Sequence, residues 1–420
     1  MRILFITQYY PPETGAAANR ISNLAEHFAI SGHAVTVLTA MPNYPQGEVF
    51  PGYRGRWLKE EQVGPTRVVR TWIYATKKNG FWNRLASYFS FMITSFMGAV
   101  FKVKTQDLLI VESPPLFLGI PGVLLSWLWR SRLVFNVSDL WPQTAVDLGV
   151  LRNRFLIRLS TTLEEVIYRQ ADLITGQTQG IVANIRRRVN TSVLQYTNGV
   201  KSGGLTAECN RDQVRNEAGF SENAFLVGYT GLHGLGQALD TVLSAADQMR
   251  DCENVFFVFW GDGPEKPHLE RLAEEKKLGN VRFFSPQPKE RMPEILSALD
   301  VAVVPLRRLN LFKAALPNKL FESMGAGVPV VVSIEGEAKN LVEKAGGGIC
   351  VPPEDAAALA SAILFLYKHP ELRQSMGRSA KQFMAANYDR RFIAQRVEQA
   401  LLQLFPKVQG VAAHTAVERS

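Results

Sequence analysis

Short apolar runs alternate with longer amphipathic stretches along the first half of the chain. The runs with strand character lie at residues 2–10 and 33–40 and in the segments LLIVESPP, RLVFNVSDLWP, DLITGQT and SVLQYTNGV. A helix of roughly residues 18–30 is predicted between the first two runs, and it stops at Gly32. Continuous apolar strands that alternate with helices are typical of a parallel sheet covered on both faces.

The pattern is lost in residues 201–223, which are polar and glycine-containing and are predicted to be a linker. It then restarts, with apolar runs at residues 225–231, 255–265, 281–288, 301–305 and 328–333. We therefore predict an α/β chain with two Rossmann-like, doubly wound domains, in residues 1–200 and 224–380. Two such domains facing across a cleft would place ligands at the carboxyl ends of both sheets.

Length and composition agree with this division. A chain of 420 residues is too long for one ordinary core, and 46% hydrophobic with 20% charged residues is normal for a globular protein. The three cysteines, Cys209, Cys252 and Cys350, are widely spaced, so they form neither a disulfide framework nor a zinc-binding spacing. This cysteine usage fits a reducing compartment and predicts a cytoplasmic protein.

The positive charge is confined to the N-terminal half. Residues 1–200 hold 21 Lys and Arg against 12 Asp and Glu, whereas residues 201–420 hold 26 of each. Nucleic acid or an anionic membrane surface could attract such a charge. No zinc-finger spacing, helix-turn-helix signature or aromatic-basic RNA motif accompanies it, so we expect a membrane surface and no nucleic acid.

Two aromatic-rich segments in the same half favour that membrane contact. Residues 81–104 are bracketed by Arg84 and by Lys102 and Lys104, and residues 116–132 carry two Trp before two Arg. Three interpretations are open: buried crossover helices, helices in partial contact with lipid headgroups, or transmembrane spans. The first apolar stretch is of marginal length for a span and contains five Ser, Thr or Tyr residues, and the second is broken by Pro and Gly.

Several ligand classes are excluded by missing motifs. Gly261-Asp262-Gly263 lacks the third glycine of a dinucleotide-binding turn, and no phosphate-binding G-x-x-x-x-G-K-[ST] loop occurs. Neither H-E-x-x-H nor D-x-D is present. We therefore expect neither a cofactor nor a metal ion.

Six segments occur in a characteristic order: QYYPPETGAAANR, DLWPQ, YTGLHGLGQALD, GDGPEK, SPQPKERMPEIL and LPNKLFESMGAGVPVV. In this order and spacing the chain resembles the GT-B glycosyltransferases of retaining family 4. The resemblance covers nearly the whole chain and is strongest to bacterial exopolysaccharide and O-antigen enzymes of the colanic-acid and N-acetylfucosaminyl transferase type. It implies that a helix over residues 381–405 crosses back to the N-terminal, acceptor-binding domain, and that a tail follows over 406–420.

The resemblance also implies an activity. It is the metal-independent transfer of a hexose, with retention of configuration, from a nucleotide sugar to a lipid-linked saccharide during cell-surface polysaccharide synthesis. UDP is favoured over GDP, and an undecaprenyl-diphosphate-linked acceptor would bring the protein to the inner face of the plasma membrane. Two alternatives remain, a nucleotide-sugar 2-epimerase and a non-catalytic nucleotide-binding subunit.

The segment at residues 316–332 would hold the donor. By resemblance, Glu322 accepts hydrogen bonds from the ribose hydroxyls, and Lys319 with the free N–H groups of its helix start holds the diphosphate. Neighbouring donor-binding residues would be Pro317, Asn318 and Leu320. The alternatives are a solvated Glu322 and a surface pair between Lys319 and Glu322.

The remaining donor contacts are implied at strand ends. They are the phosphate loop with Gly231, His233, Gly234 and Gln237, the turn with Gly261 and Gly263, the base-binding loop with Pro286 and Gln287, and Gly15 in the first domain. Glycines at these positions would let the backbone approach the nucleotide closely, although tight turns alone would also explain them.

The chain departs from the family pattern in three places, one of which, the phosphate loop, includes two residues. Ala314 stands where the first Glu of the E-x7-E motif would lie, and Leu232 and Gln237 replace the usual cations of the phosphate loop. Asp139 stands in place of a catalytic-region His, so we expect it to take the acceptor's proton. The alternative for Asp139 is a helix N-cap before Leu140.

Overall fold

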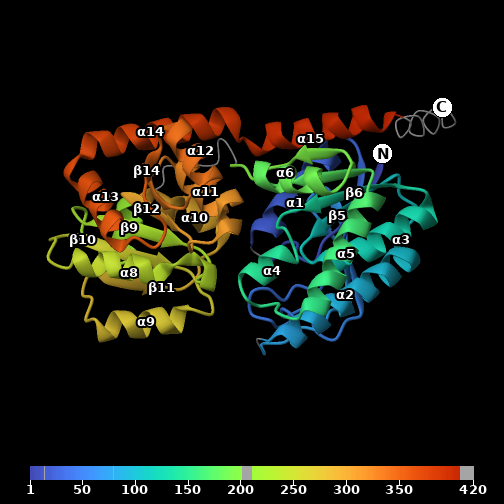
Figure 1. Ribbon diagram of the computed structural model, residues 1–420, viewed down its shortest axis with the longest axis horizontal. Coiled ribbons are helices and arrows are strands. Elements are labelled where there is room, and N and C mark those ends of the chain that lie inside the picture. The colour runs from blue at the N-terminus through green and yellow to red at the C-terminus, as the bar shows by residue number, and fades with distance from the viewer. Residues whose placement is uncertain (14, 79, 201–210, 407–420) are drawn as a thin grey trace. The chain divides into compact units, whose positions relative to one another are not determined.

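The computed structural model describes residues 1–420 except 14, 79, 201–210 and 407–420. Contacts divide the chain into two compact units (Figure 1). Unit 1 contains residues 1–197 and the C-terminal segment that begins at Arg391, and unit 2 contains Asn198–Arg390. Much of the predicted linker and nearly all of the predicted tail lie outside the described residues.

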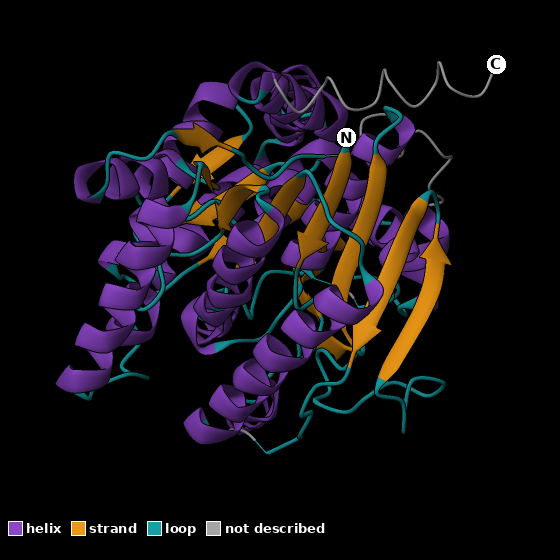
Figure 2. Cartoon of the chain, turned by 90° about the vertical axis from the view of Figure 1, so that its right-hand side faces the viewer, coloured by secondary structure: helices purple, strands orange, loops and turns teal. Residues whose placement is uncertain are grey.

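Unit 1 is built on an eight-stranded sheet of order β3-β4-β2-β1-β5-β6-β7-β8. The strands are β1 (Arg2–Ile6), β2 (Ala34–Ala40), β3 (Leu58–Val63), β4 (Thr66–Thr71), β5 (Leu108–Ser113), β6 (Arg132–Val137), β7 (Leu173–Gly176) and β8 (Val193–Gln195). Figure 2 shows strands in orange and helices in purple. All neighbours pair in parallel except β3 and β4.

The β3–β4 hairpin adds an antiparallel edge strand, which was not predicted, to the predicted parallel sheet. Val63 pairs with Thr66, so only two residues form the turn, and Gly64 adopts a φ of 55° there. Glycine reaches this conformation without steric cost. An antiparallel strand fits at this position because β3 lies at the sheet edge, where its alternating pattern leaves one face to water.

The helices of unit 1 are α1 (Ala16–Ile30), α2 (Phe81–Lys102), α3 (Gly119–Trp129), α4 (Gln143–Asp147), α5 (Arg154–Gln170), α6 (Gln179–Arg188) and α15 (Arg390–Leu404), with a short 3₁₀ turn η1 (Leu116–Leu118). One core joins the sheet to α2, α3 and α5 through Phe91, Leu125 and Ile167, which are at most 1% exposed. The carboxylate of Glu398 attaches α15 to the rest of unit 1, because it accepts hydrogen bonds from His27 at 2.9 Å and from His33 at 2.8 Å.

Unit 2 contains a fully parallel six-stranded sheet of order β11-β10-β9-β12-β13-β14. Its strands are β9 (Phe225–Thr230), β10 (Val255–Trp260), β11 (Val281–Phe284), β12 (Val301–Pro305), β13 (Val330–Ser333) and β14 (Gly348–Cys350). Its helices are α7 (Arg211–Glu217), α8 (Leu239–Gln248), α9 (Lys266–Glu275), α10 (Met292–Ala298), α11 (Asn318–Ala326), α12 (Glu337–Ala345), α13 (Ala356–Lys368) and α14 (Pro370–Asn387), with 3₁₀ turns η2 (Leu235–Gln237), η3 (Lys289–Arg291) and η4 (Asn310–Ala314). Separate apolar clusters cover the two faces, as a doubly wound sheet requires.

The predicted helix over residues 381–405 is wrong in one respect, because it is broken. Helix α14 ends at Asn387 and α15 begins at Arg390. Between them, the carbonyl of Tyr388 accepts from Val200 N–H at 2.8 Å, and Arg390 N–H donates to the Val200 carbonyl at 2.9 Å. These bonds pull the backbone into a parallel bridge between Val200 and Asp389, which is incompatible with continuous helix.

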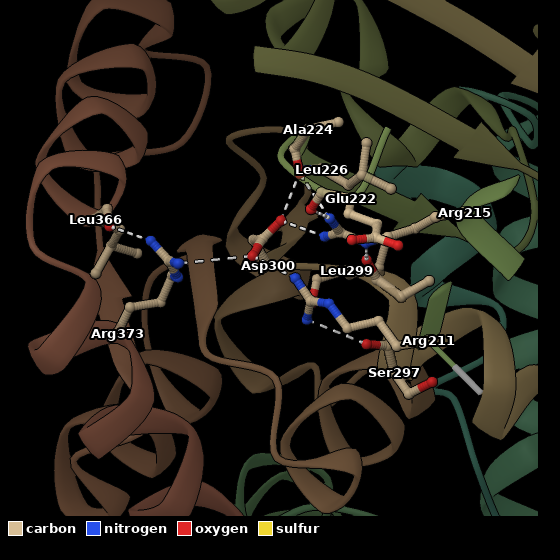
Figure 3. Close-up of polar contacts among 11 residues, drawn as sticks. Arg211, Arg215, Glu222, Ala224, Leu226, Ser297, Leu299, Asp300, Leu366 and Arg373 are labelled. Atoms are coloured by element: carbon tan, nitrogen blue, oxygen red, sulfur yellow. Dashed lines mark hydrogen bonds and ion pairs between the residues drawn. The ribbon is translucent and has the colours of Figure 1, made fainter. Parts of the chain in front are cut away.

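The predicted linker also contains structure, since α7 occupies residues 211–217. It is fixed by the buried carboxylate of Asp300, which lies just before β12 (Figure 3). Asp300 pairs with Arg215 at 2.6 Å, Arg211 at 2.7 Å and Arg373 of α14 at 3.6 Å, and it accepts the Leu226 N–H. A polar segment therefore folds because its arginines reach a distant partner.

Helix α2 decides between some of the three interpretations of the aromatic-rich segments. Among the described helices, only residues Trp82–Lys102 are long and apolar enough to cross a membrane by length and composition. A buried core helix can pass the same test, but only 22% of the apolar window is buried here. The interpretation as a fully buried crossover helix is therefore wrong.

Candidate active site

The sheet order of unit 2 defines where a ligand would bind. From β9 the chain proceeds to β10 and β11 on one side, whereas β12, β13 and β14 lie on the other. Such a reversal creates a crevice at the carboxyl ends of the two central strands. The loop after β9 and the start of α11 meet there, because Lys319 of α11 contacts Tyr229 and Gln237.

Lys319 is held by two uncharged oxygens. Its Nζ donates to Gln237 Oε1 at 2.6 Å and to the Tyr229 hydroxyl, and it lies 3.9 Å from the centroid of the Tyr229 ring. The Tyr229 hydroxyl in turn donates to the Leu232 carbonyl at 2.6 Å. An ammonium carries three donors, so one remains for a ligand.

No carboxylate pairs with Lys319 in the described part of the chain, and this sets its acidity. Burial lowers the pKa of Lys319 from 10.5 to about 7, and the charge of Glu322 opposes the shift only in part. The alternative interpretation, a surface pair between Lys319 and Glu322, is therefore wrong. An anionic ligand would complete the site electrostatically.

Glu322 lies one turn further along α11 and is half-buried. It has no hydrogen bond or ion pair among the described residues, so both carboxylate oxygens can accept from a ligand. Burial raises its pKa, whereas the positive charges of Arg390, Lys289 and Lys319 act in the opposite direction. The alternative interpretation, a fully solvated Glu322, is therefore wrong.

The start of α11 offers backbone donors as well. Pro317 occupies the N-cap position, where its side chain caps no N–H group, and the first turn of a helix leaves such groups without helical partners. Asn318 is half-buried, whereas the Leu320 side chain is fully buried in the core and its N–H donates to the Pro317 carbonyl. The Leu320 side chain therefore cannot contact a ligand.

His233 belongs to the phosphate loop, but its side chain is buried in the core of unit 2 and is not available to a ligand. Its ring is 0% exposed and packs 5.6 to 6.3 Å from the rings of Tyr229, Phe259 and Phe283. Burial, with Lys266 and Lys319 nearby, lowers its pKa to about 4, so the ring is neutral at physiological pH. The backbone of His233 is also fully hydrogen-bonded: its N–H donates to the Asp262 carbonyl, and its carbonyl accepts from the Glu265 N–H.

Gly261 and Gly263 are explained by the packing of two loops. A Cβ on Gly261 would lie 1.9 Å from the Gly231 carbonyl oxygen, and one on Gly263 would lie 2.3 Å from the His233 carbonyl oxygen. Both residues also have φ near +155°. The two glycines thus let the turn after β10 support the phosphate loop, which is a reason for glycine independent of any ligand.

The other predicted donor residues are accessible. Gly231 is exposed and Gly234 is half-buried. Pro286 is exposed and Gln287 half-buried in the loop after β11, where Gln287 Nε2 donates to the Ser285 carbonyl at 3.4 Å.

Unit 1 carries a buried polar network at the carboxyl ends of β5, β6 and β7. Glu112 accepts from Arg20, Ser138 and Asn136, and Thr175 donates to Asn136 Oδ1 at 2.5 Å. Burying this much polarity is costly unless the groups satisfy one another, as they do here. No local sequence pattern indicated this network, because its members lie on four separate segments.

Asp139 follows this network directly in the loop after β6. Its side chain is exposed, no helix begins at Leu140, and α4 starts only at Gln143 with Pro142 at the N-cap position. The N-cap interpretation is therefore wrong. Desolvation by the surrounding protein raises the pKa of Asp139 to about 6; Arg20 counters the shift and Glu112 adds to it.

Glu13 fixes the loop that precedes Gly15, and sequence reasoning missed it. Its buried carboxylate accepts the N–H groups of Tyr10, Asn43 and Tyr44 at 2.9 to 3.2 Å. Desolvation raises its pKa to about 7 despite these bonds. Gly15 itself lies at the N-cap position of α1 with a φ of 157°.

Among the described residues, no group of three or more His, Cys, Asp or Glu side chains could hold a metal ion. Unit 2 contains the cation Lys319 near the unpaired carboxylate of Glu322. Unit 1 contains the exposed carboxylate of Asp139 next to the polar network. These groups suit an anionic, hydroxyl-bearing ligand and a proton transfer.

Two family models match the chain. The glycosyl transferase 4-like domain matches residues 15–194, and the glycosyl transferases group 1 model matches residues 210–383. Together they cover most of both units. The chain therefore consists of a glycosyl transferase 4-like domain followed by a glycosyl transferases group 1 domain.

Relatives of this glycosyl transferase agree with the assignment. The WcaI protein of Escherichia coli (strain K12), named for glycosyl transfer in colanic acid biosynthesis, is 28% identical and covers 88% of this chain and 93% of its own. Among solved structures, sucrose-phosphate synthase from Thermosynechococcus elongatus superposes with a TM-score of 0.77 at 19% identity, covering 97% and 99% of the two chains. Anabaena HepE in complex with UDP-glucose gives 0.71 at 18% identity, covering 96% and 100%. The fold of this glycosyl transferase is GT-B.

Proposed function

We propose that this glycosyl transferase moves a hexose from a UDP-sugar to a lipid-linked saccharide during cell-surface polysaccharide synthesis. The observation that carries the proposal is the half-buried Lys319, held by Tyr229 and Gln237 one turn before an unpaired Glu322. The UDP-glucose complex of HepE supports a UDP donor, and the name of WcaI supports a role in polysaccharide synthesis.

On the donor side, Glu322 accepts hydrogen bonds from the two ribose hydroxyls. Lys319 and the N–H groups at the start of α11 stabilise the charge that develops on the leaving diphosphate. The loop with Pro286 and Gln287 meets the base. These protein groups supply the counter-charge by themselves, so the reaction needs no metal ion.

The reaction forms one bond and breaks another at the anomeric carbon. An acceptor hydroxyl oxygen bonds to that carbon, and the bond to the β-phosphate oxygen breaks as UDP departs. Attack from the face of the leaving phosphate retains the configuration. Asp139 takes the hydroxyl proton, which its exposed position and its pKa of about 6 allow at neutral pH.

The acceptor is a saccharide on an undecaprenyl-diphosphate type of carrier. Such a lipid stays in the bilayer, so the protein works in the cytoplasm at the inner face of the plasma membrane. The excess of basic over acidic residues in residues 1–200 supports attraction to its anionic surface.

Two measurements test this function. A thermal-shift panel of UDP-, GDP- and ADP-sugars should show the largest stabilisation with a UDP-sugar, because a ligand stabilises by mass action. Radiolabelled donor with a membrane extract and excess EDTA should then give a labelled lipid. An epimerised donor or the absence of any turnover would instead indicate an epimerase or a non-catalytic subunit.

A further inference from the structure

The outer surfaces of α2, α3 and α5 lack the polarity that a water-facing surface normally has. Helix α3 packs against both α2 and α5, so the three helices form one layer on the same face of the unit 1 sheet (Figure 1). A helix at a protein surface usually turns polar residues outward. Here the outward residues are largely apolar.

On α2 the outward row continues for five turns. It consists of Trp82, Ala86, Phe89, Ile93, Met97, Val100 and Phe101, at successive spacings of three or four residues before the last. Trp82 and Phe101 are 73% and 74% exposed. The opposite side of the helix carries the core residues Phe91 and Ala99, so α2 is apolar on both sides.

Helices α3 and α5 extend this surface. The outward residues of α3 are Leu124, Trp127 and Leu128. On α5, an apolar row of Phe155, Leu159 and Val166 runs beside a row of three arginines, Arg154, Arg158 and Arg169. The sequence indicated membrane contact for the segments of α2 and α3 but not for α5, because the mixed polar and apolar pattern of α5 is typical of an ordinary amphipathic helix.

The charge on this face has a single sign. Its exposed ionic residues are arginines and lysines, among them Arg84, Lys102 and Arg130, and none of its exposed residues is acidic. Of the two glutamates of α5, Glu164 is buried, and Glu165 is half-buried and paired with Arg169 and Arg188. A surface both apolar and basic complements a layer of anionic headgroups over acyl chains.

A row of aromatic rings connects this face with the loop of Asp139. Phe89 of α2 lies 4.6 Å from Phe117 of η1, and Phe117 lies 5.6 Å edge-on from Trp141, measured between ring centroids. Trp141 is two residues beyond Asp139. The row gives an apolar path from the outside of the helix layer to the acceptor side of unit 1.

We propose that the α2–α3–α5 face docks on an anionic bilayer, and that the acceptor's hydrocarbon chain follows Phe89, Phe117 and Trp141 toward Asp139. The second part rests on the proposed function. A second copy of the chain is a poorer occupant, because a two-fold contact would bring like charges together. The apolar rows enter the headgroup region while the arginines contact phosphates.

Co-sedimentation with vesicles tests the docking face. The protein should bind phosphatidylcholine vesicles that contain phosphatidylglycerol at low salt, bind poorly without phosphatidylglycerol, and be released as salt rises. The variant Phe101→Ser/Trp127→Ser should lower the partition coefficient by about tenfold or more, because two exposed aromatic rings lose their burial in lipid. The matched control Ile30→Ser/Trp57→Ser changes residues of similar exposure elsewhere on unit 1 and should bind like the wild type.

The charge is tested in the same assay. Arg154→Gln/Arg158→Gln should weaken binding to anionic vesicles, whereas Arg186→Gln/Arg187→Gln on α6 should have little effect. Equal binding by face and control variants would overturn the proposal. So would a wild-type protein that ignores anionic vesicles, or a dimer that the face variants dissociate and that binds no lipid.

Two further readouts separate this inference from the proposed function. Brominated lipids should quench fluorescence in the wild type more than in Trp82→Phe/Trp127→Phe, independently of any turnover. Calorimetric titration with UDP should give the same affinity for face and control variants. If UDP fails to bind any variant while vesicle binding behaves as expected, the donor assignment fails and the docking face stands.

Discussion

Lys319 donates to Gln237 Oε1 at 2.6 Å across unit 2, joining the start of α11 to the end of the loop after β9. Gln237 is one of the two positions where the family pattern led us to expect a cation. A neutral amide there leaves Lys319 as the sole ammonium that contacts this loop among the described residues. The Arg307 guanidinium also contacts this loop, at the Leu235 carbonyl, but it pairs with Asp240 and Glu354. Lys319 is therefore the cation at this loop that has a lowered pKa and no acidic partner among the residues described.

The first prediction is a pH dependence of UDP binding. In the free protein the pKa of Lys319 is about 7, so the amine is increasingly neutral above that pH. Diphosphate favours the ammonium, so binding above pH 7 takes up a proton. The affinity should be greatest below pH 7 and should fall by up to about tenfold per pH unit above it.

Calorimetry in buffers of different ionisation enthalpy would measure this proton uptake directly. Uridine, which lacks the diphosphate, should show a flat profile over the same range, and so should UDP with Lys319→Gln. A wild-type affinity for UDP that is constant from pH 6 to about pH 9 would contradict the role of Lys319.

The second prediction concerns Glu322. Replacing it by Ala should weaken UDP binding by about 2–4 kcal/mol, because two charge-assisted hydrogen bonds to the ribose are lost. The fold should survive, since the carboxylate has no partner among the described residues. Glu343→Ala, an exposed change on α12, is the control. An unchanged dissociation constant in Glu322→Ala would remove this residue from the donor site.

The third prediction separates Asp139 from donor binding. Asp139→Asn should abolish most turnover but leave the UDP affinity intact, because the carboxylate acts on the acceptor. In the wild type, the rate should fall as the pH drops below about 6, where Asp139 becomes protonated. Asp147→Asn in α4 serves as the control, and a variant Asp139→Asn that turns over normally would refute the assignment.

The fourth prediction addresses the glycine contact beneath the phosphate loop. Gly261→Ala should destabilise unit 2 and reduce UDP binding, because the new Cβ would lie 1.9 Å from the Gly231 carbonyl oxygen. The backbone must shift to relieve this, at a cost above about 1 kcal/mol. Gly279→Ala meets no atom within 4 Å and should be tolerated. Equal melting temperatures for the two variants would show that the loops can separate freely.

The fifth prediction tests what holds α7 and α14 at the sheet of unit 2. Asp300→Asn leaves three arginines without their common carboxylate, and Arg215 is only 1% exposed. Loss of one partner from a buried ionic cluster should cost about 3–5 kcal/mol. Urea unfolding at neutral pH would measure it against Asp251→Asn, an exposed control. Coincident unfolding curves would mean that the cluster contributes little.

Repeating local patterns were enough to predict the two sheets. Apart from the β3–β4 hairpin, the strands are largely apolar and most are followed by an amphipathic stretch. The sequence by itself therefore determined a mainly parallel α/β architecture and placed Lys319 and Glu322 at a helix start. Strand lengths were overestimated, as at β1, which ends at Ile6, because the buried residues Thr7, Gln8 and Tyr10 pack in the loop that follows instead of extending the strand.

Only the tertiary structure decided the contacts between distant segments. Arg20 and Glu112 are 92 residues apart, and Lys319 and Gln237 are 82 apart, so no local pattern could indicate that they meet. The same holds for burial. His233 faces the core and Phe101 faces outward although both lie in segments of mixed character, because the packing of neighbouring elements decides which side of a loop or helix is covered.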